Sequence, residues 1–91
     1  MTARPSREAI QAEIHRQLAI CGPGKSICPS EVARALLPEK WQPLMTPVRQ
    51  AAVALMREGQ IEVLRKGKPV EPGEVRGVIR LRLPAVPSSM D

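Results

Sequence analysis

Side chains suited to contacting nucleic-acid bases occur between residues 49 and 57. Arg49, Gln50 and Arg57 can donate hydrogen bonds to guanine or adenine edges in a major groove. Val53, between them, is small enough to let a helix backbone approach the bases, and its methyl groups suit contact with a thymine methyl. These residues predict either a groove-binding helix face or an ordinary solvated one, and the pattern favours neither.

A second group of basic side chains occurs toward the C-terminus, where phosphate oxygens could pair with them. The candidate phosphate contacts are Arg65, Lys66, Lys68, Arg76, Arg80 and Arg82, with Arg34 in addition. Glu62, Glu71 and Glu74 dilute this charge, so we expect modest affinity for an anionic partner. The alternative interpretation is an edge strand whose charges block aggregation.

The sequence gives less support to a phosphate-binding loop, a reactive thiol, a zinc site or acid–base catalysis. The segment Gly22–Ser26 is similar to a phosphate-binding loop, but the motif needs a glycine where Ala19 stands. Cys28 begins a predicted helix, where the helix dipole favours a reactive thiolate, and a thiol-dependent sensor is a third hypothesis. Cys21, Cys28 and His15 match no common zinc spacing. The carboxylates form no acid–base pair, and we expect no enzyme, cofactor or metal.

The chain length and the net charge limit the classes of function that the protein can have. The 91 residues suffice for one domain but not for a catalytic domain plus a recognition domain. Fourteen Lys and Arg against nine Asp and Glu give a net charge of +5, which favours anionic partners. Charged residues interrupt residues 1–20, where a signal peptide would be apolar, and no apolar run approaches the ~18 residues of a membrane span. We therefore expect a cytoplasmic protein without membrane contact.

Three helices are predicted to position the candidate residues. Start signals occur at Ser6, Cys28-Pro29 and Thr46-Pro47, and stop signals at Gly22, Pro38 and Gly59. The first helix has an apolar face of Ile10, Ile14, Leu18 and Cys21. The third, residues 47–58 with Thr46 as its cap, has an apolar face of Val48, Ala51, Ala52, Leu55 and Met56. The groove candidates then lie on its outward side.

After Gly59 the apolar period changes to two, which predicts strands at residues 61–63 and 79–83. The segment Lys66–Gly77 between them is predicted to be a loop too long for a tight hairpin. A short extended piece at residues 25–27 is expected to pair with the last strand. This order predicts an α+β winged helix-turn-helix: three helices and a small antiparallel sheet with a long wing loop.

The predicted domain spans residues 6–83, with disordered tails at residues 1–5 and 84–91. Its helix-turn-helix connection, Pro38–Thr46, is longer than the usual three or four residues. Trp41 within this connection is predicted to be a core plug that closes the gap between the helices, with a surface site for a partner as the alternative.

Six short motifs together resemble one protein family. They are Cys28–Arg34 (CPSEVAR), Trp41, Val48-Arg49, Gly59–Ile61, Lys66–Lys68 and Gly77–Arg82. At these spacings they resemble domain-of-unknown-function family 3253, a family of small bacterial proteins, over about residues 8 to 83. The family is similar to winged helices and carries no assigned activity, so the resemblance implies the fold and no function.

These observations predict a winged-helix protein that binds double-stranded nucleic acid, most simply DNA. The alternative, from another functional class, is a protein-interaction module that docks a partner or a second copy through the same helix-turn-helix face. An exposed Val53 favours that alternative. The sequence does not separate DNA from structured RNA.

Overall fold

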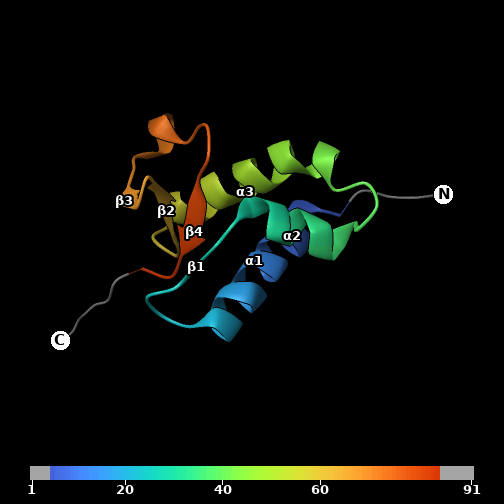
Figure 1. Ribbon diagram of the computed structural model, residues 1–91, viewed down its shortest axis with the longest axis horizontal. Coiled ribbons are helices and arrows are strands. Elements are labelled where there is room, and N and C mark those ends of the chain that lie inside the picture. Colours follow the sequence, from blue (N-terminus) through green and yellow to red (C-terminus); the bar gives the residue numbers. More distant parts are fainter. Residues whose placement is uncertain (1–4, 85–91) are drawn as a thin grey trace.

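Three helices pack beside one end of a small antiparallel sheet in the computed structural model, which describes residues 5–84 (Figure 1). The helices are α1 (Arg7–Cys21), α2 (Pro29–Leu36) and α3 (Met45–Arg57). The strands are β1 (Ser26–Ile27), β2 (Glu62–Arg65), β3 (Lys68–Pro69) and β4 (Arg80–Arg82). The predicted α+β class is confirmed. Apart from Pro5 and Pro84, the predicted tails lie outside the described residues.

The first two helices begin where their sequence signals predict. The Ser6 hydroxyl accepts a hydrogen bond from the Ala9 N–H at 3.1 Å, which satisfies one donor of the first turn of α1. Before α2, the Glu31 carboxylate accepts one from the Cys28 N–H at 3.1 Å. Pro29 stands at the first helical position, where a missing N–H costs no hydrogen bond.

The predicted start of α3 is wrong. Thr46 does not cap the helix, because a 3-10 turn at Gln42–Leu44 runs directly into α3 and Leu44 already has helical backbone angles. Thr46 is exposed within the first turn. Pro47 is tolerated there because first-turn N–H groups have no helical acceptor. The connection from α2 is therefore shorter than the Pro38–Thr46 predicted, and its last part is helical.

The sheet has the order β1-β4-β2-β3, and all three pairings are antiparallel. The predicted pairing of the short extended piece with the last strand is confirmed, since Ser26 lies opposite Arg82 and Ile27 opposite Leu81. Val63 of β2 lies opposite Leu81 of β4, and both side chains are fully buried. The strand at the outer edge, β3, was not predicted.

The long connection between β2 and β4 is as predicted, but the prediction that Lys66–Gly77 is loop throughout is wrong, because this segment contains β3. Lys66 and Gly67 form a two-residue turn, with Arg65 paired to Lys68 across it. Their φ angles are 55° and 81°, and two positive values are the signature of a type I′ turn. Such turns usually contain Asn-Gly or Asp-Gly, so Lys-Gly gave no hairpin signal. The remaining connection, residues 70–79, is called the crossover loop below and contains a 3-10 turn at Pro72–Glu74.

Lys66→Asn is expected to stabilise the protein by about 0.5–1 kcal/mol, because a left-handed backbone costs most L residues roughly 1–2 kcal/mol and Asn less. Urea denaturation followed by circular dichroism measures the change. Lys66→Ala is the matched control, since it removes the same charge without favouring positive φ. Equal stability of the two variants would contradict a type I′ turn at this position.

Candidate nucleic-acid interface

The solvent-facing line of α3 carries three of the four groove candidates. Gln50 and Arg57 are exposed and Val53 is half-buried, and their i, i+3 and i+7 spacing places them on one side of the helix. Exposed Thr46, four residues before Gln50, continues the same line. These four residues are called the α3 stripe below. Thr46 was missed as a site residue because its position before proline was interpreted as a helix cap.

Arg49, the fourth groove candidate, lies on the flank of this line. Its Nη2 donates a hydrogen bond to the Gly77 carbonyl at 2.7 Å. Its Nε is buried and has no hydrogen-bond partner among residues 5–84. The guanidinium of Arg49 is therefore directed at the crossover loop, in contrast to the exposed side chains of Gln50 and Arg57.

The crossover loop lies against α3. It leaves the edge strand β3 and returns to β4 on the far side of β2, and its 3-10 turn contacts α3 on the way (Figure 1). Val75 packs against the core from this loop. Arg76 is exposed, and Val78 is 85% exposed. The loop thus adds the cationic Arg76 and the apolar Val78 to the surface, and its Glu71 and Glu74 are exposed as well.

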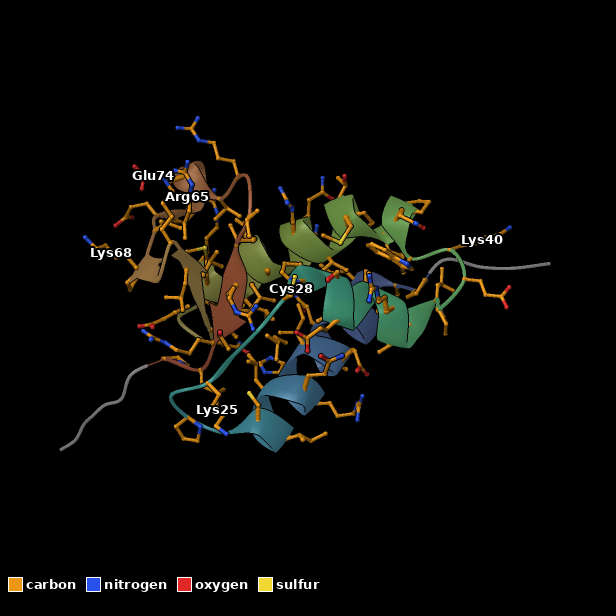
Figure 2. The ribbon with its side chains drawn as sticks, in the orientation of Figure 1. Lys25, Cys28, Lys40, Arg65, Lys68 and Glu74 are labelled. Carbon is orange, nitrogen blue, oxygen red and sulfur yellow. The ribbon has the colours of Figure 1, made fainter. Side chains whose placement is uncertain are left out.

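The tip of the β2–β3 hairpin carries three further phosphate candidates. Lys66 and Lys68 are exposed and Arg65 is half-buried, and the three line an open hollow with Pro69 and Val70. Figure 2 shows Arg65 and Lys68 at the sheet end of the molecule, with Lys25 beside the end of α1. Within the described chain, neither these three residues nor Arg76 forms an ion pair. All four cations are available to an anion.

Arg80 and Arg82, which sequence reasoning placed with these cations, are engaged within the sheet. Arg80 donates to the Ser26 hydroxyl at 2.7 Å and to the Ser26 carbonyl at 3.0 Å. Arg82 forms an ion pair with Glu62, which lies directly opposite it on β2. Both contacts tie β4 to its neighbours, so these arginines have less freedom to reach a phosphate than those of the hairpin tip.

Arg34 lies on α2, apart from the hairpin, with its guanidinium carbon 4.5 Å from the centroid of the Trp41 ring. This distance is within the range of a cation–π interaction. Trp41 is half-buried and packs against the core, which confirms the predicted plug. Arg34 lies over one face of the Trp41 ring.

A protein-family model described as a protein of unknown function, DUF3253, matches residues 7–84 of the chain. The chain belongs to the DUF3253 family. The match covers almost the entire described structure, so the family corresponds to this fold as a unit. None of the curated proteins matches the chain. Any function for this DUF3253 protein must therefore be argued from its own surface.

Outside the candidate interface, the described residues of the DUF3253 chain bring together fewer side chains that could bind a ligand. Within residues 5–84, no three His, Cys, Asp or Glu side chains lie close enough to hold a metal ion. The same residues contain no helix with both the length and the apolar character needed to cross a membrane. Cys21 and Cys28 are free and half-buried, and the Ser30 hydroxyl donates to the Cys28 Sγ at 3.1 Å.

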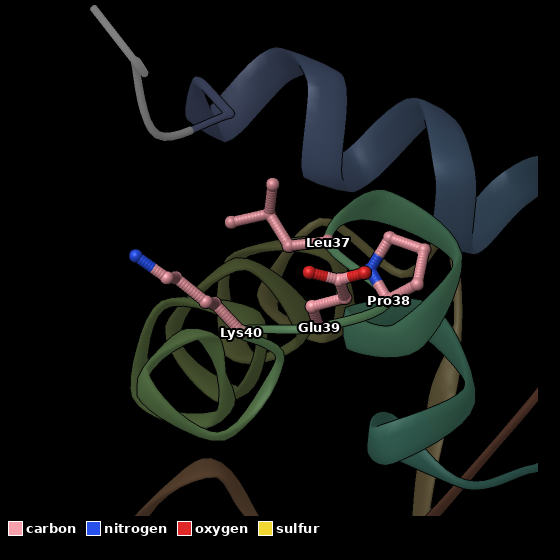
Figure 3. Close-up of a pocket in the computed structure, with 4 residues that line it drawn as sticks. All are labelled: Leu37, Pro38, Glu39 and Lys40. Atoms are coloured by element: carbon pink, nitrogen blue, oxygen red, sulfur yellow. The ribbon is translucent and has the colours of Figure 1, made fainter.

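A hollow of about 340 Å³ lies where α2 ends, lined by Leu37, Pro38, Glu39 and Lys40 (Figure 3). It is open to solvent. Figure 3 shows the Lys40 side chain extending away from the Glu39 carboxylate, so the two charged groups do not converge on one point. The hollow has the shape of a shallow surface depression, without the convergent polar groups of a ligand site.

Trp41→Ala is expected to lower the free energy of unfolding by about 2 kcal/mol, which is less than the roughly 3–5 kcal/mol of a fully buried tryptophan because Trp41 is half-buried. Trp41→Leu, which retains apolar volume, should cost less. Urea denaturation monitored by circular dichroism compares the three proteins. A loss below about 0.5 kcal/mol for Trp41→Ala, typical of a surface position, would contradict the plug.

Proposed function

We propose that this DUF3253 protein is a winged helix that binds double-stranded DNA in the cytoplasm and has no catalytic role. The α3 stripe enters the major groove. The hairpin tip and Arg76, both at the sheet end, contact phosphates beside that groove. The two free cysteines agree with a reducing compartment.

The arrangement of the elements supports the winged-helix part of the proposal. α1 and α2 both contact α3, as in a three-helix core that presents its last helix. The short β1 pairs with β4, and β4 pairs with β2. The β2–β3 hairpin and the crossover loop take the place of the wing, which a winged helix has between its last two strands.

The observation that carries the DNA-binding part is the composition of the α3 stripe. Gln50 and Arg57 are hydrogen-bond donors suited to adenine and guanine, and both are exposed on one helix line. Thr46 adds a hydroxyl and a methyl group to the same line. A helix with its side chains measures roughly 10–12 Å across, and the major groove is about 12 Å wide. A helix with this outward line has the dimensions and the donors that groove binding requires.

The distribution of charge supports a moderate, salt-sensitive interaction. Arg65, Lys66, Lys68 and Arg76 lack ion pairs in the described part of the chain. Each phosphate contact releases condensed counterions, and the logarithm of the binding constant falls by about 0.9 per contact for each decade of salt. Four contacts predict a slope of about −3.6. This salt dependence is much weaker than that of a strongly salt-dependent repressor, whose slope is about −10.

One observation favours the alternative, a protein-interaction module. Val78 is 85% exposed beside α3, and Val53 is partly exposed on the α3 stripe. Apolar side chains at such a position suit a protein partner or a second copy. Self-association detected by light scattering and abolished by Val53→Glu would support this function. A monomer at all concentrations would remove the second copy as the partner.

Lys68→Ala and Arg57→Ala are expected to weaken DNA binding in different ways. Lys68→Ala should weaken binding to all duplexes and make the salt slope shallower by about 0.9, because one phosphate contact is lost. Arg57→Ala should cost about 1–3 kcal/mol on a selected preferred site and much less on mixed sequence, because a base contact is lost. Fluorescence anisotropy with both duplexes measures these changes.

The matched control is Lys25→Ala, which removes the same charge beside the end of α1, away from the hairpin tip (Figure 2). It should leave the affinity within about two-fold and the slope unchanged. Equal effects of Lys25→Ala and Lys68→Ala would show that only net charge matters. An Arg57→Ala protein that binds the preferred site as well as the wild type would remove α3 from the proposed interface.

A further inference from the structure

Among residues 5–84, one side-chain hydrogen bond joins α3 to the part of the crossover loop nearest β4. Arg49 Nη2 donates to the carbonyl of Gly77, 28 residues later, at 2.7 Å. A hydrogen bond from a charged donor is stronger than a neutral one. The contact therefore couples the orientation of the loop to the helix that carries the α3 stripe.

The loop has little other polar support at this point. Among residues 5–84, no backbone hydrogen bond outside the helices and strands involves residues 76–79. Gly77 has a φ of 69°, in the left-handed region that favours glycine. The two residues after Gly77 differ strongly in solvent exposure, since Val78 is 85% exposed and Ile79 is 2% exposed. The buried Ile79 anchors one side of Gly77, and Arg49 holds Gly77 itself.

Stability alone does not account for the placement of Arg49. Its Nε is buried without a hydrogen-bond partner among the described residues, and a buried unpaired donor destabilises a fold. A methionine of similar length would fill the same space without that penalty. The guanidinium gains only the bond to Gly77, the residue between Arg76 and Val78.

We infer that Arg49 is a positioning residue that holds the segment Arg76–Val78 against α3, so that this segment and the α3 stripe form one preorganised nucleic-acid surface. This inference rests on the proposed function. Arg49 itself contacts neither base nor phosphate. It lowers the conformational entropy that the loop would lose on binding, which raises affinity without adding a contact to the DNA.

The first experiment tests the positioning without DNA. Backbone ¹⁵N relaxation measures the order of the Arg76, Gly77 and Val78 amides in the wild type, Arg49→Met and Arg49→Lys. The wild type should have order parameters near those of rigid backbone, about 0.85, and Arg49→Met should lower them to below about 0.6. Arg49→Lys should restore much of the order, because an ammonium group can donate to the same carbonyl. Unchanged order in Arg49→Met would overturn the inference.

The second experiment is a double-mutant cycle on duplex DNA affinity. Arg49→Met should weaken binding roughly five- to ten-fold, and adding it to Arg76→Ala should weaken binding little further, because Arg49 acts through Arg76 and its neighbour. The control pair, Arg49→Met with Arg57→Ala, should show multiplied effects. Independent effects of Arg49→Met and Arg76→Ala would make Arg49 a direct contact and overturn its assignment.

The two experiments separate the inference from the function on which it rests. If the wild type does not bind duplex DNA at low salt, the proposed function fails, and the relaxation data still decide whether Arg49 holds the loop. If the wild type binds and the loop is equally ordered without Arg49, the DNA-binding proposal stands and the positioning role is wrong. Matched thermal unfolding of all variants verifies that each is folded.

Discussion

The apolar face of α3 packs against α1, α2 and the sheet, and its four central residues Val48, Ala51, Ala52 and Leu55 are almost completely removed from solvent. The chain has no Phe or Tyr, so its core is built from aliphatic side chains that must interlock closely. Two alanines at the centre of this face let neighbouring elements approach α3. Burial of this face prevents α3 from rotating about its own axis. It therefore determines which side chains the opposite face of the helix presents to solvent.

The fold divides its basic side chains into two groups with different roles. Arg80 and Arg82 bond to neighbouring strands, and Arg34 covers the Trp41 ring. The cations of the hairpin tip and Arg76 have no such partners in the part of the chain that the structure describes. Net charge therefore overstates the cationic surface. What concentrates the remaining charge at the sheet end is the turn at Lys66-Gly67 together with the bend at Gly77.

The helices whose ends depend on side chains close to them in sequence could be predicted. Helices α1 and α2 follow from caps and spacing because a side chain such as Ser6 acts on backbone groups three residues away. The start of α3 was missed because a 3-10 turn before it overrode the Thr46 signal, and the hairpin was missed because Lys66 adopts a conformation that favours other residues. For the candidate site, Gln50, Val53 and Arg57 of the α3 stripe followed from periodicity, whereas Thr46 did not. The partners of Arg49 and Arg80 did not, since they lie 28 and 54 residues away.

The measurement that tests the central claim most directly is the fluorescence anisotropy of a labelled mixed-sequence DNA duplex titrated with the wild-type protein over a range of salt concentrations. The account predicts micromolar binding at low salt and a log–log slope of about −3 to −4, from four phosphate contacts. Absence of binding at low salt, or an affinity independent of salt, would contradict it. The exposed surface of α3 would then be assigned to a protein partner.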